Sequence, residues 1–389
     1  MRRAVVNLAL SLAVIVLVAA LVEGASAFYA HVIAQSPNYD AKQFRLTRPP
    51  PYANSPYFSS DFVTESFVEP RGWVTAKDED FVIPNDFSGH WFNVRDSRRV
   101  TTGTPAQPHH RLHLFGASSI YCAEVPDEFT VASALQRNLN AVAPGEWEVR
   151  NYGVPSLNSG QELLRLKSTG IDPGDVIVFY DGPTDLERVY NGNVRGWVID
   201  ESRKITDAYT PAEKLLLYLN RRLARYSYFI REFVSLRPKR PAAMADPVLI
   251  DANLQFARET YRSNIHEAAV YAAARGARFV HFLQPTLFSL ASLTPYEERV
   301  RKVAVRNYPA LDKVYQIGYP ALRAAVEDNR RAGIDTHDVT DLFDKRPAGE
   351  EVYLDFSHLA EVGNTKVAET IFRFAFQDLA LRQQSAVKP

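Results

Sequence analysis

The chain of 389 residues contains a single cysteine and carries no net charge. The one cysteine, Cys122, excludes a disulfide bond within the chain, and we interpret it as a small packing residue. Lysine and arginine together number 45, as do aspartate and glutamate, so the formal net charge at pH 7 is zero. A protein that binds nucleic acid needs a concentrated basic surface, and the balanced charge argues against that class of partner.

The sequence also has little that indicates a metal site. His109, His110 and His113 stand close together, and this spacing invites a metal-binding interpretation. No matching carboxylate or cysteine pattern supports it. We therefore expect no metal and no other cofactor.

An apolar run occupies residues 4–22 and follows Arg2 and Arg3. Its length suits a helix that spans a bilayer and is long for the apolar part of a signal peptide. The sequence Ala25-Ser26-Ala27 looks like a signal-peptidase site, so cleavage near Ala27 is the alternative. In both cases the positive charges keep the N-terminus inside and send the body across the membrane. We favour an inner-membrane anchor over residues 1–27 with the remainder in the periplasm, and a secreted or periplasmic protein after cleavage is the alternative.

Residues 28–110 show no long helical period and are rich in proline, asparagine, aspartate and serine. Extended pieces at residues 62–64 and 91–94 indicate small strands. We expect an irregular segment that contains strands and packs on the main domain.

From residue 111 onward, strand and helix patterns alternate. The expected strands are mostly continuous apolar runs, as in parallel sheets that are buried on both faces, and comprise residues 111–115, 147–151, 175–180, 278–284 and 335–340. The expected helices between them include residues 130–141, 159–168 and 252–275. The alternation predicts a three-layer α/β/α domain with a parallel sheet of roughly five strands over residues 111–375, followed by a tail at 376–389.

Residues 186–247 form a long insertion between the third and fourth strands of this domain. Its helix, at about residues 212–236, combines leucines and phenylalanines at helical spacing with four arginines. One interpretation is an ordinary amphipathic helix with a solvated basic face, and the other is a basic lid or membrane-surface helix near the site.

Two short motifs at opposite ends of the domain carry the chemistry. Ser118 follows the first expected strand at a strand-to-helix turn, and Asp355 and His358 stand about 240 residues later. A serine hydroxyl becomes a useful nucleophile when an imidazole takes its proton and a carboxylate orients that imidazole. Because active sites of such sheets lie at the carboxyl ends of the strands, we expect these side chains to converge.

Four blocks of the sequence resemble the SGNH (GDSL-type) hydrolases. The blocks are residues 115–119 (Phe-Gly-Ala-Ser-Ser), 151–155 (Asn-Tyr-Gly-Val-Pro), 180–185 (Tyr-Asp-Gly-Pro-Thr-Asp) and 355–358 (Asp-Phe-Ser-His). The resemblance covers about two thirds of the chain and implies an SGNH/flavodoxin-like fold. It further implies that Ser118 is the nucleophile, His358 the general base and then acid, and Asp355 the orienting carboxylate.

The same resemblance assigns an oxyanion hole with one unusual member. The backbone N–H groups of Ser118 and Gly153 would donate to the oxyanion, and the position of the family's asparagine is taken here by Thr184. A threonine offers one short, rotatable hydroxyl where asparagine offers a longer NH2 donor. The hole is then weaker, completed by a neighbour such as Asn158, or adapted to another acceptor.

Each of these residues also has a purely structural interpretation. Ser118 would cap the helix that follows it, and Asp355 with His358 would form a surface capping pair. Gly153 would serve as a turn residue. Gln284, at the end of the fourth expected strand, either lines the pocket or simply ends the strand.

The preferred interpretation is an exported or membrane-anchored serine esterase that cleaves an O-acyl ester through an acyl-serine intermediate. The expected partners are an acyl-ester substrate and, through the N-terminal helix, the membrane. Envelope-facing relatives suggest an O-acetyl group on a polysaccharide. One rival is an O-acyltransferase with the same triad, and the other is a glycan-binding or assembly protein that kept the fold.

Overall fold

The computed structural model describes residues 2–28, 49–63, 65–66, 73–75, 81–191, 227, 229, 247–308, 310–377 and 379. The chain forms two compact units, one of residues 1–38 with 200–242 and one of residues 39–199 with 243–389. The helix expected at residues 212–236 lies outside the described residues, apart from 227 and 229.

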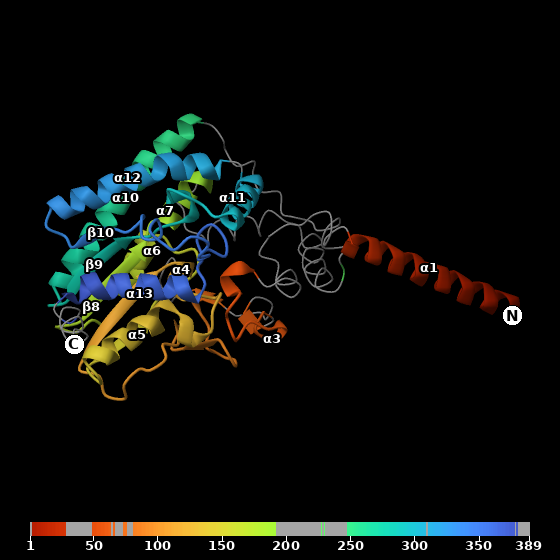
Figure 1. Cartoon of the computed structure of the whole chain (residues 1–389), viewed down its shortest axis with the longest axis horizontal. Coiled ribbons are helices and arrows are strands. Elements are labelled where there is room, and N and C mark those ends of the chain that lie inside the picture. Colours follow the sequence, from red (N-terminus) through yellow and green to blue (C-terminus); the bar gives the residue numbers. More distant parts are fainter. Residues whose placement is uncertain are drawn as a thin grey trace. The chain divides into compact units, whose positions relative to one another are not determined.

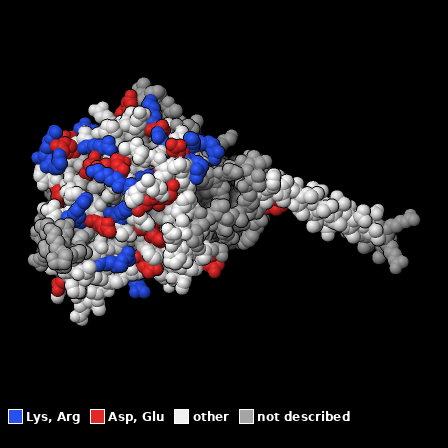
Figure 2. Space-filling view, in the orientation of Figure 1, with Lys and Arg blue, Asp and Glu red and all other residues white. Residues whose placement is uncertain are grey.

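The first unit contains α1 (Arg2–Phe28), the helix that carries the N-terminus in Figure 1. Its stretch Ala9–Phe28 has a mean hydropathy of 2.2 and is 6% buried. Figure 2 shows its surface as almost free of charged side chains. By length and composition α1 could cross a membrane, and an N-terminal signal sequence meets the same description.

The second unit is built on a sheet of eight strands in the order β10-β9-β8-β6-β7-β5-β4-β3. The first five of these strands are parallel: β10 (Thr336–Asp338), β9 (Arg278–Leu283), β8 (Val176–Asp181), β6 (His110–Gly116) and β7 (Trp147–Asn151). All five expected strands are therefore present. Their order, with the first strand in chain sequence between the second and the third, is that of flavodoxin-like folds.

Three short antiparallel strands from the N-terminal segment extend this sheet beyond β7. They are β5 (Arg98–Arg99), β4 (Asn93–Arg95) and β3 (Phe87–Ser88), and a separate hairpin pairs β1 (Trp73–Thr75) with β2 (Val82–Pro84). The segment also contains a 3-10 turn, η2 (Pro50–Tyr52). The strand expected at residues 62–64 is wrong, because residues 60–63 form the helical turn α3 (Ser60–Val63), whose Phe62 packs among aromatic rings.

Helices cover both faces of the sheet (Figure 1). One apolar cluster combines the sheet with α5 (Val131–Val142) and α13 (Glu361–Ala375). The other combines it with α6 (Ser159–Lys167), α7 (Pro183–Asn191), α10 (Pro247–Ala273) and α12 (Leu311–Arg331). The shorter helices are α4 (Ser118–Tyr121), η4 (Asp127–Phe129), η6 (Leu287–Ser289) and α11 (Pro295–Asn307).

The two clusters follow from alternation along the buried strands. In β8, Val178 belongs to the cluster with α5 and α13, while Ile177 and Phe179 belong to the other. Both faces of β8 are apolar, which is why the strand reads as a continuous apolar run. The result is the three-layer α/β/α arrangement that the sequence predicts.

Candidate active site

The turn at residues 353–359 presents Asp355 and His358 as a hydrogen-bonded pair. A bridge between Tyr353 and Leu359 closes this turn. One oxygen of Asp355 accepts the backbone N–H groups of Ser357 and His358 at 2.8 and 2.7 Å. The other oxygen lies 2.7 Å from His358 Nδ1. The carboxylate is therefore fixed by the backbone and orients the imidazole, leaving Nε2 to face away from it.

The charges of this turn reinforce one another. Burial by itself raises the pKa of Asp355, but the imidazole of His358 and the hydrogen bonds lower it overall. Burial lowers the pKa of His358, but the carboxylates of Asp355, Glu124 and Glu187 raise it to about 10. At neutral pH the structure therefore favours an imidazolium beside an ionised Asp355.

Ser118 begins α4 directly after β6. The N-cap of this short helix is Ala117, which makes no side-chain cap, so Ser118 occupies the first helical position instead of the capping position. The helix ends at Cys122, whose φ of +52° is left-handed. Ser118 is half-buried, as a nucleophile that must meet a substrate has to be.

The residues next to Ser118 and His358 connect the two turns. Ser119, which follows Ser118, donates to the carbonyl of Ser357, which precedes His358, over 3.4 Å. Gln284, at the end of β9, donates to Ser119 Oγ at 2.7 Å. The structure thus brings the serine turn and the histidine turn together, and Gln284 links both to the sheet. Sequence reasoning left the role of Gln284 open and did not identify Ser119.

Gly153 lies against the serine turn in a place that only glycine fits. A Cβ atom there would stand 2.3 Å from the backbone nitrogen of Tyr121. Its N–H, expected to serve the oxyanion, donates to Asn151 Oδ1 at 2.9 Å. Asn151 in turn donates to the carbonyl of Ile120 at 2.7 Å. The geometry explains the glycine by close backbone approach and shows its N–H engaged with a side chain.

Thr184 lies in the first turn of α7, the helix that follows β8 in the chain, and is buried. The turn before it needs glycine, since Gly182 has a φ of +113° and a Cβ there would meet Leu283 at 2.5 Å. Asn158, the alternative donor considered from the sequence, caps α6 by accepting the N–H of Gln161 at 3.0 Å.

Two glutamates that sequence reasoning missed lie beside His358. Glu124 Oε1 is 3.9 Å from His358 Nε2, the ring nitrogen opposite the one that Asp355 holds. Glu187, on α7, is half-buried, and its pKa is raised to about 7 by burial and by Asp355 and is lowered by His358. Glu124 stands six positions after Ser118, but nothing in a linear pattern shows that its side chain turns back toward a histidine 234 positions later.

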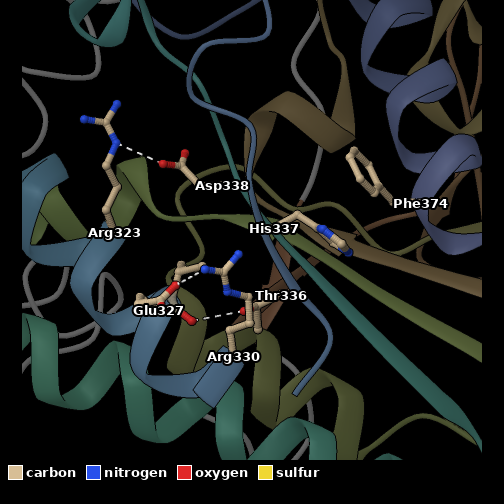
Figure 3. A pocket seen from close by; sticks show the side chains of 8 residues that line it. Arg323, Glu327, Arg330, Thr336, His337, Asp338 and Phe374 are labelled. Carbon is tan, nitrogen blue, oxygen red and sulfur yellow. Dashed lines mark hydrogen bonds and ion pairs between the residues drawn. The ribbon is translucent and has the colours of Figure 1, made fainter. Parts of the chain in front are cut away.

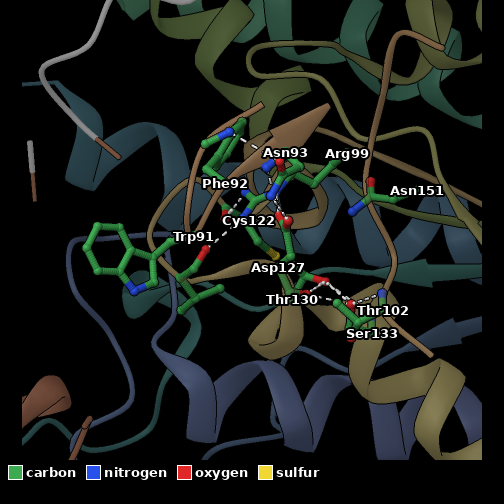
Figure 4. A network of polar contacts seen from close by, with 12 residues as sticks. Trp91, Phe92, Asn93, Arg99, Thr102, Cys122, Asp127, Thr130, Ser133 and Asn151 are labelled. Carbon is green, nitrogen blue, oxygen red and sulfur yellow. Dashed lines mark hydrogen bonds and ion pairs between the residues drawn. The ribbon is translucent and has the colours of Figure 1, made fainter. Parts of the chain in front are cut away.

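A buried arginine holds the loop that carries Glu124 (Figure 4). Arg99, on β5, is 1% exposed, and its Nε lies 2.6 Å from Asp127 Oδ1. It also donates to the carbonyls of Cys122 and Val125 at 2.7 and 2.8 Å. The guanidinium stacks 3.5 Å from the ring centre of Phe92. The N-terminal segment therefore fixes the chain that follows the serine turn.

A second buried network lies around the end of β8. Tyr261 donates to Asp181 Oδ1 at 2.6 Å, and His281 Nε2 lies 3.0 Å from the same oxygen. Glu162 is completely buried, and burial, Asp181 and Asp185 raise its pKa well above the usual value. Burial and Asp181 also raise the pKa of Asp185 to about 7. Burial and neighbouring like charges thus favour the protonated form of both carboxyl groups.

The three clustered histidines have separate surroundings. His113 is buried and lies 2.9 Å from Asp175, whereas His109 lies on the surface, 2.8 Å from Glu146. Within the described residues, no group of three or more histidine, cysteine, aspartate or glutamate side chains could hold a metal ion.

A separate polar pocket of about 390 Å³ lies between α12, β10 and Phe374 of α13. Figure 3 shows the side chains that line it. Its arginines are ion-paired: Arg323 lies 3.0 Å from Asp338, and Arg330 pairs with Glu327. None of the candidate catalytic residues lines it. Because the charged side chains that line the pocket pair with one another, we assign them a structural role.

Comparison with family models and with curated proteins finds no match. Solved structures do resemble the chain. A member of the lipolytic G-D-S-L family from Veillonella parvula is 14% identical, with a TM-score of 0.37, over 69% of this chain and 98% of that chain. An acetylxylan esterase from Geobacillus stearothermophilus is 12% identical, with a TM-score of 0.38, over 69% of this chain and 95% of that one.

An α/β hydrolase enzyme from the metagenome of Lake Arreo in Spain is 13% identical, with a TM-score of 0.38, over 70% of this chain and 95% of that chain. Lipolytic G-D-S-L proteins and esterases are thus among the solved structures to which this chain is similar. The chemistry of the site rests on its own geometry.

Proposed function

We propose that the chain is an SGNH-type serine hydrolase that cleaves an O-acyl ester through an acyl-serine intermediate. The observation that carries this proposal is the hydrogen-bonded pair of Asp355 and His358, connected to the turn of Ser118 by the contact of Ser119 with Ser357. A carboxylate, an imidazole and a hydroxyl in this order are the parts that nucleophilic ester hydrolysis requires.

In the proposed reaction His358 Nε2 accepts the proton of the Ser118 hydroxyl while Ser118 Oγ attacks the ester carbonyl. Asp355 holds the proton on Nδ1 and stabilises the imidazolium that forms. The tetrahedral intermediate collapses, His358 protonates the leaving alcohol, and the acyl group stays on Ser118. Water, or a sugar hydroxyl in a transferase, then attacks the acyl group while the same imidazole takes its proton. The bond between the acyl carbon and Ser118 Oγ breaks, and His358 returns the proton to the serine.

The proposed oxyanion hole consists of the backbone N–H groups of Ser118 and Gly153 and the hydroxyl of Thr184. For Gly153 to donate, its N–H must leave the carbonyl oxygen of the Asn151 side chain, now 2.9 Å away. Such donors contribute most when they are already aimed at the developing charge. Turnover should therefore be slow, because the N–H of Gly153 must first give up its hydrogen bond to Asn151 and because the side chain of Thr184 is short.

The proposed substrate is an O-acyl, and specifically an O-acetyl, ester on an envelope polysaccharide. The support is α1, whose apolar stretch and preceding arginines suit an anchor that places the second unit in the periplasm. Whether water or a sugar hydroxyl takes the acyl group depends on the acceptor. Acyl release that accelerates with added oligosaccharide would identify a transferase.

The triad assignment is tested by single and double substitutions. Ser118→Ala and His358→Ala should each remove most turnover of a small acetyl ester, and the double variant should be little slower than either, because members of a triad act as a unit. Labelling with a fluorophosphonate probe should require Ser118. Independent, multiplicative losses, or labelling that survives Ser118→Ala, would contradict the assignment and favour a binding protein with this fold.

A further inference from the structure

His358 is approached by carboxylates on both of its ring nitrogens. Asp355 lies 2.7 Å from Nδ1, as a triad requires. Glu124 Oε1 lies 3.9 Å from Nε2, the nitrogen that must take the proton of Ser118. A triad does not need this second carboxylate, and its charge favours the protonated form of the ring.

The position of Glu124 is built into the fold. Its side chain is 7% exposed and is therefore buried. Its carbonyl accepts the hydroxyl of Tyr52 at 2.6 Å. Arg99 holds the carbonyls of Cys122, two residues before Glu124, and of Val125, the residue after it. Tyr52 of η2 and Arg99 of β5 thus fix the loop that carries this buried carboxyl group.

The other titratable groups near His358 and Asp355 are a further carboxyl group and two tyrosine hydroxyls. Glu187 reaches it from α7, and the hydroxyls of Tyr296 on α11 and Tyr315 on α12 lie near Asp355. The nearest cations act on the glutamates: Arg99 on Glu124 and Arg188 on Glu187. The imidazole thus has the carboxyl groups of Asp355, Glu124 and Glu187 around it. Burial raises the pKa of Glu124 above its usual value, and the imidazolium of His358 opposes this and favours the carboxylate.

We propose that Glu124 is a positioning residue that holds the proton on His358 Nε2 and so keeps the base charged and inactive in the resting protein. This inference rests on the proposed function, since it gives the resting state of the same base. A protonated Nε2 cannot accept the proton of Ser118. Turnover then requires a pH high enough to deprotonate His358, or a bound substrate that weakens the interaction of Glu124 with the imidazole.

The prediction is opposite to that for an ordinary active-site residue: removal of the Glu124 charge should raise turnover at neutral pH. Glu124→Gln keeps the size of the side chain and removes its charge. The limb of kcat/KM that rises with pH should move down by about one unit or more, the shift expected for one opposite charge at this distance. At pH 7 that corresponds to about tenfold faster turnover of 4-nitrophenyl acetate.

The matched controls come from the same region. Glu128→Gln removes an equal charge from an exposed residue of the same loop and should leave the pH profile in place. Glu187→Gln should move the limb in the same direction but by less, because Glu187 raises the pKa of His358 less than Glu124 does. A merely structural role for Glu124 would lower kcat without moving the limb.

A second measurement is independent of turnover. In full-length protein that carries Ser118→Ala, the titration of His358 can be followed by nuclear magnetic resonance of the labelled imidazole, with and without Glu124→Gln. A fall in its pKa by one unit or more supports the proposal even if no ester is hydrolysed, in which case the proposed function alone fails. An unchanged titration of His358 in a folded Glu124→Gln protein overturns the proposal, whatever the activity.

Discussion

At the scale of single residues, Thr184 is where the site departs most from the family that its sequence resembles. Thr184 is buried in the first turn of α7, and the resemblance assigns it the position of the family's oxyanion donor. Thr184→Val keeps the shape and removes the donor, so turnover of an acetyl ester should fall by about a hundredfold if the hydroxyl serves the oxyanion. Thr184→Asn should restore a longer donor and give equal or faster turnover.

The measurement is kcat for both variants, with Ser118→Ala as the background rate. Circular dichroism of each variant provides the control for folding. Equal turnover in Thr184→Val and the parent protein would remove Thr184 from the oxyanion hole and leave the N–H groups as its donors.

The sequence predicts the residues that carry local patterns and misses those that depend on the folded chain. Ser118, Asp355 and His358 stand in short motifs beside expected strands and helices, so the alternation of elements predicts that they converge. The structure brings their two turns together through Ser119 and the carbonyl of Ser357. Ser119 and Glu124 carry no motif of their own. Their roles depend on which way a four-residue helix and a left-handed Cys122 turn the chain, which no spacing encodes.

At the scale of elements, the short antiparallel strands join the loop at residues 122–127, which carries Glu124, to the rest of the N-terminal segment. Arg99 of β5 is the key link, since one buried guanidinium serves Asp127 and the carbonyls of the loop. Arg99→Met keeps apolar bulk but removes every one of these donors, and leaves Asp127 without its ion pair. Loss of one member of a buried ion pair typically costs about 3–5 kcal/mol.

Urea denaturation of the full chain in detergent should show this loss of stability. The matched control is the same substitution at an exposed ion pair. Arg331→Met breaks the surface ion pair with Glu327 and should lower the free energy of unfolding by less than about 1 kcal/mol. If Arg99→Met were no less stable than this control, the ion pair would not hold the loop.

The long elements could be predicted from the sequence and the short ones could not. The apolar run of β8 and the helical period of α5 extend over enough residues to be distinguished from chance. Strands β3 and β5 have two residues each, too few for any alternation to be visible. Residues 62–64 (Phe-Val-Thr) are aromatic and β-branched, which favours a strand. Residues 60–63 form a helical turn instead, in which Phe62 packs among aromatic rings.

At the scale of the whole molecule, the buried carboxyl groups make stability depend on pH. Glu162 has a folded pKa raised well above its unfolded value of about 4.3, so the native state binds its proton more tightly. Its contribution is complete below the unfolded pKa and is lost as pH rises toward the folded pKa. Asp185, with a pKa of about 7, acts in the same direction.

The midpoint of thermal unfolding should therefore fall between pH 5 and pH 8 in the parent protein and fall less in Glu162→Gln. The amide of glutamine donates toward Asp181 without a proton that can be lost. A variant with the same pH dependence as the parent would show that Glu162 is not the group that titrates.

The N-terminal helix decides where the molecule resides. If α1 is retained as an anchor, the protein should stay in the membrane fraction after washing with carbonate. Recovery of soluble protein that begins at Phe28 would show cleavage after Ala27 instead. N-terminal sequencing of the mature protein distinguishes these outcomes directly.

The single cysteine gives the molecule a built-in reporter of local opening. Cys122 is buried at the end of the serine helix, its thiol contacts the carbonyl of Ser119 at 3.0 Å, and burial raises its pKa to about 12. Reagents that alkylate thiols can reach it only when the chain next to Ser118 separates from Arg99. With no other thiol in the chain, the rate of alkylation reports how often the loop at residues 122–127 opens while the rest of the protein stays folded.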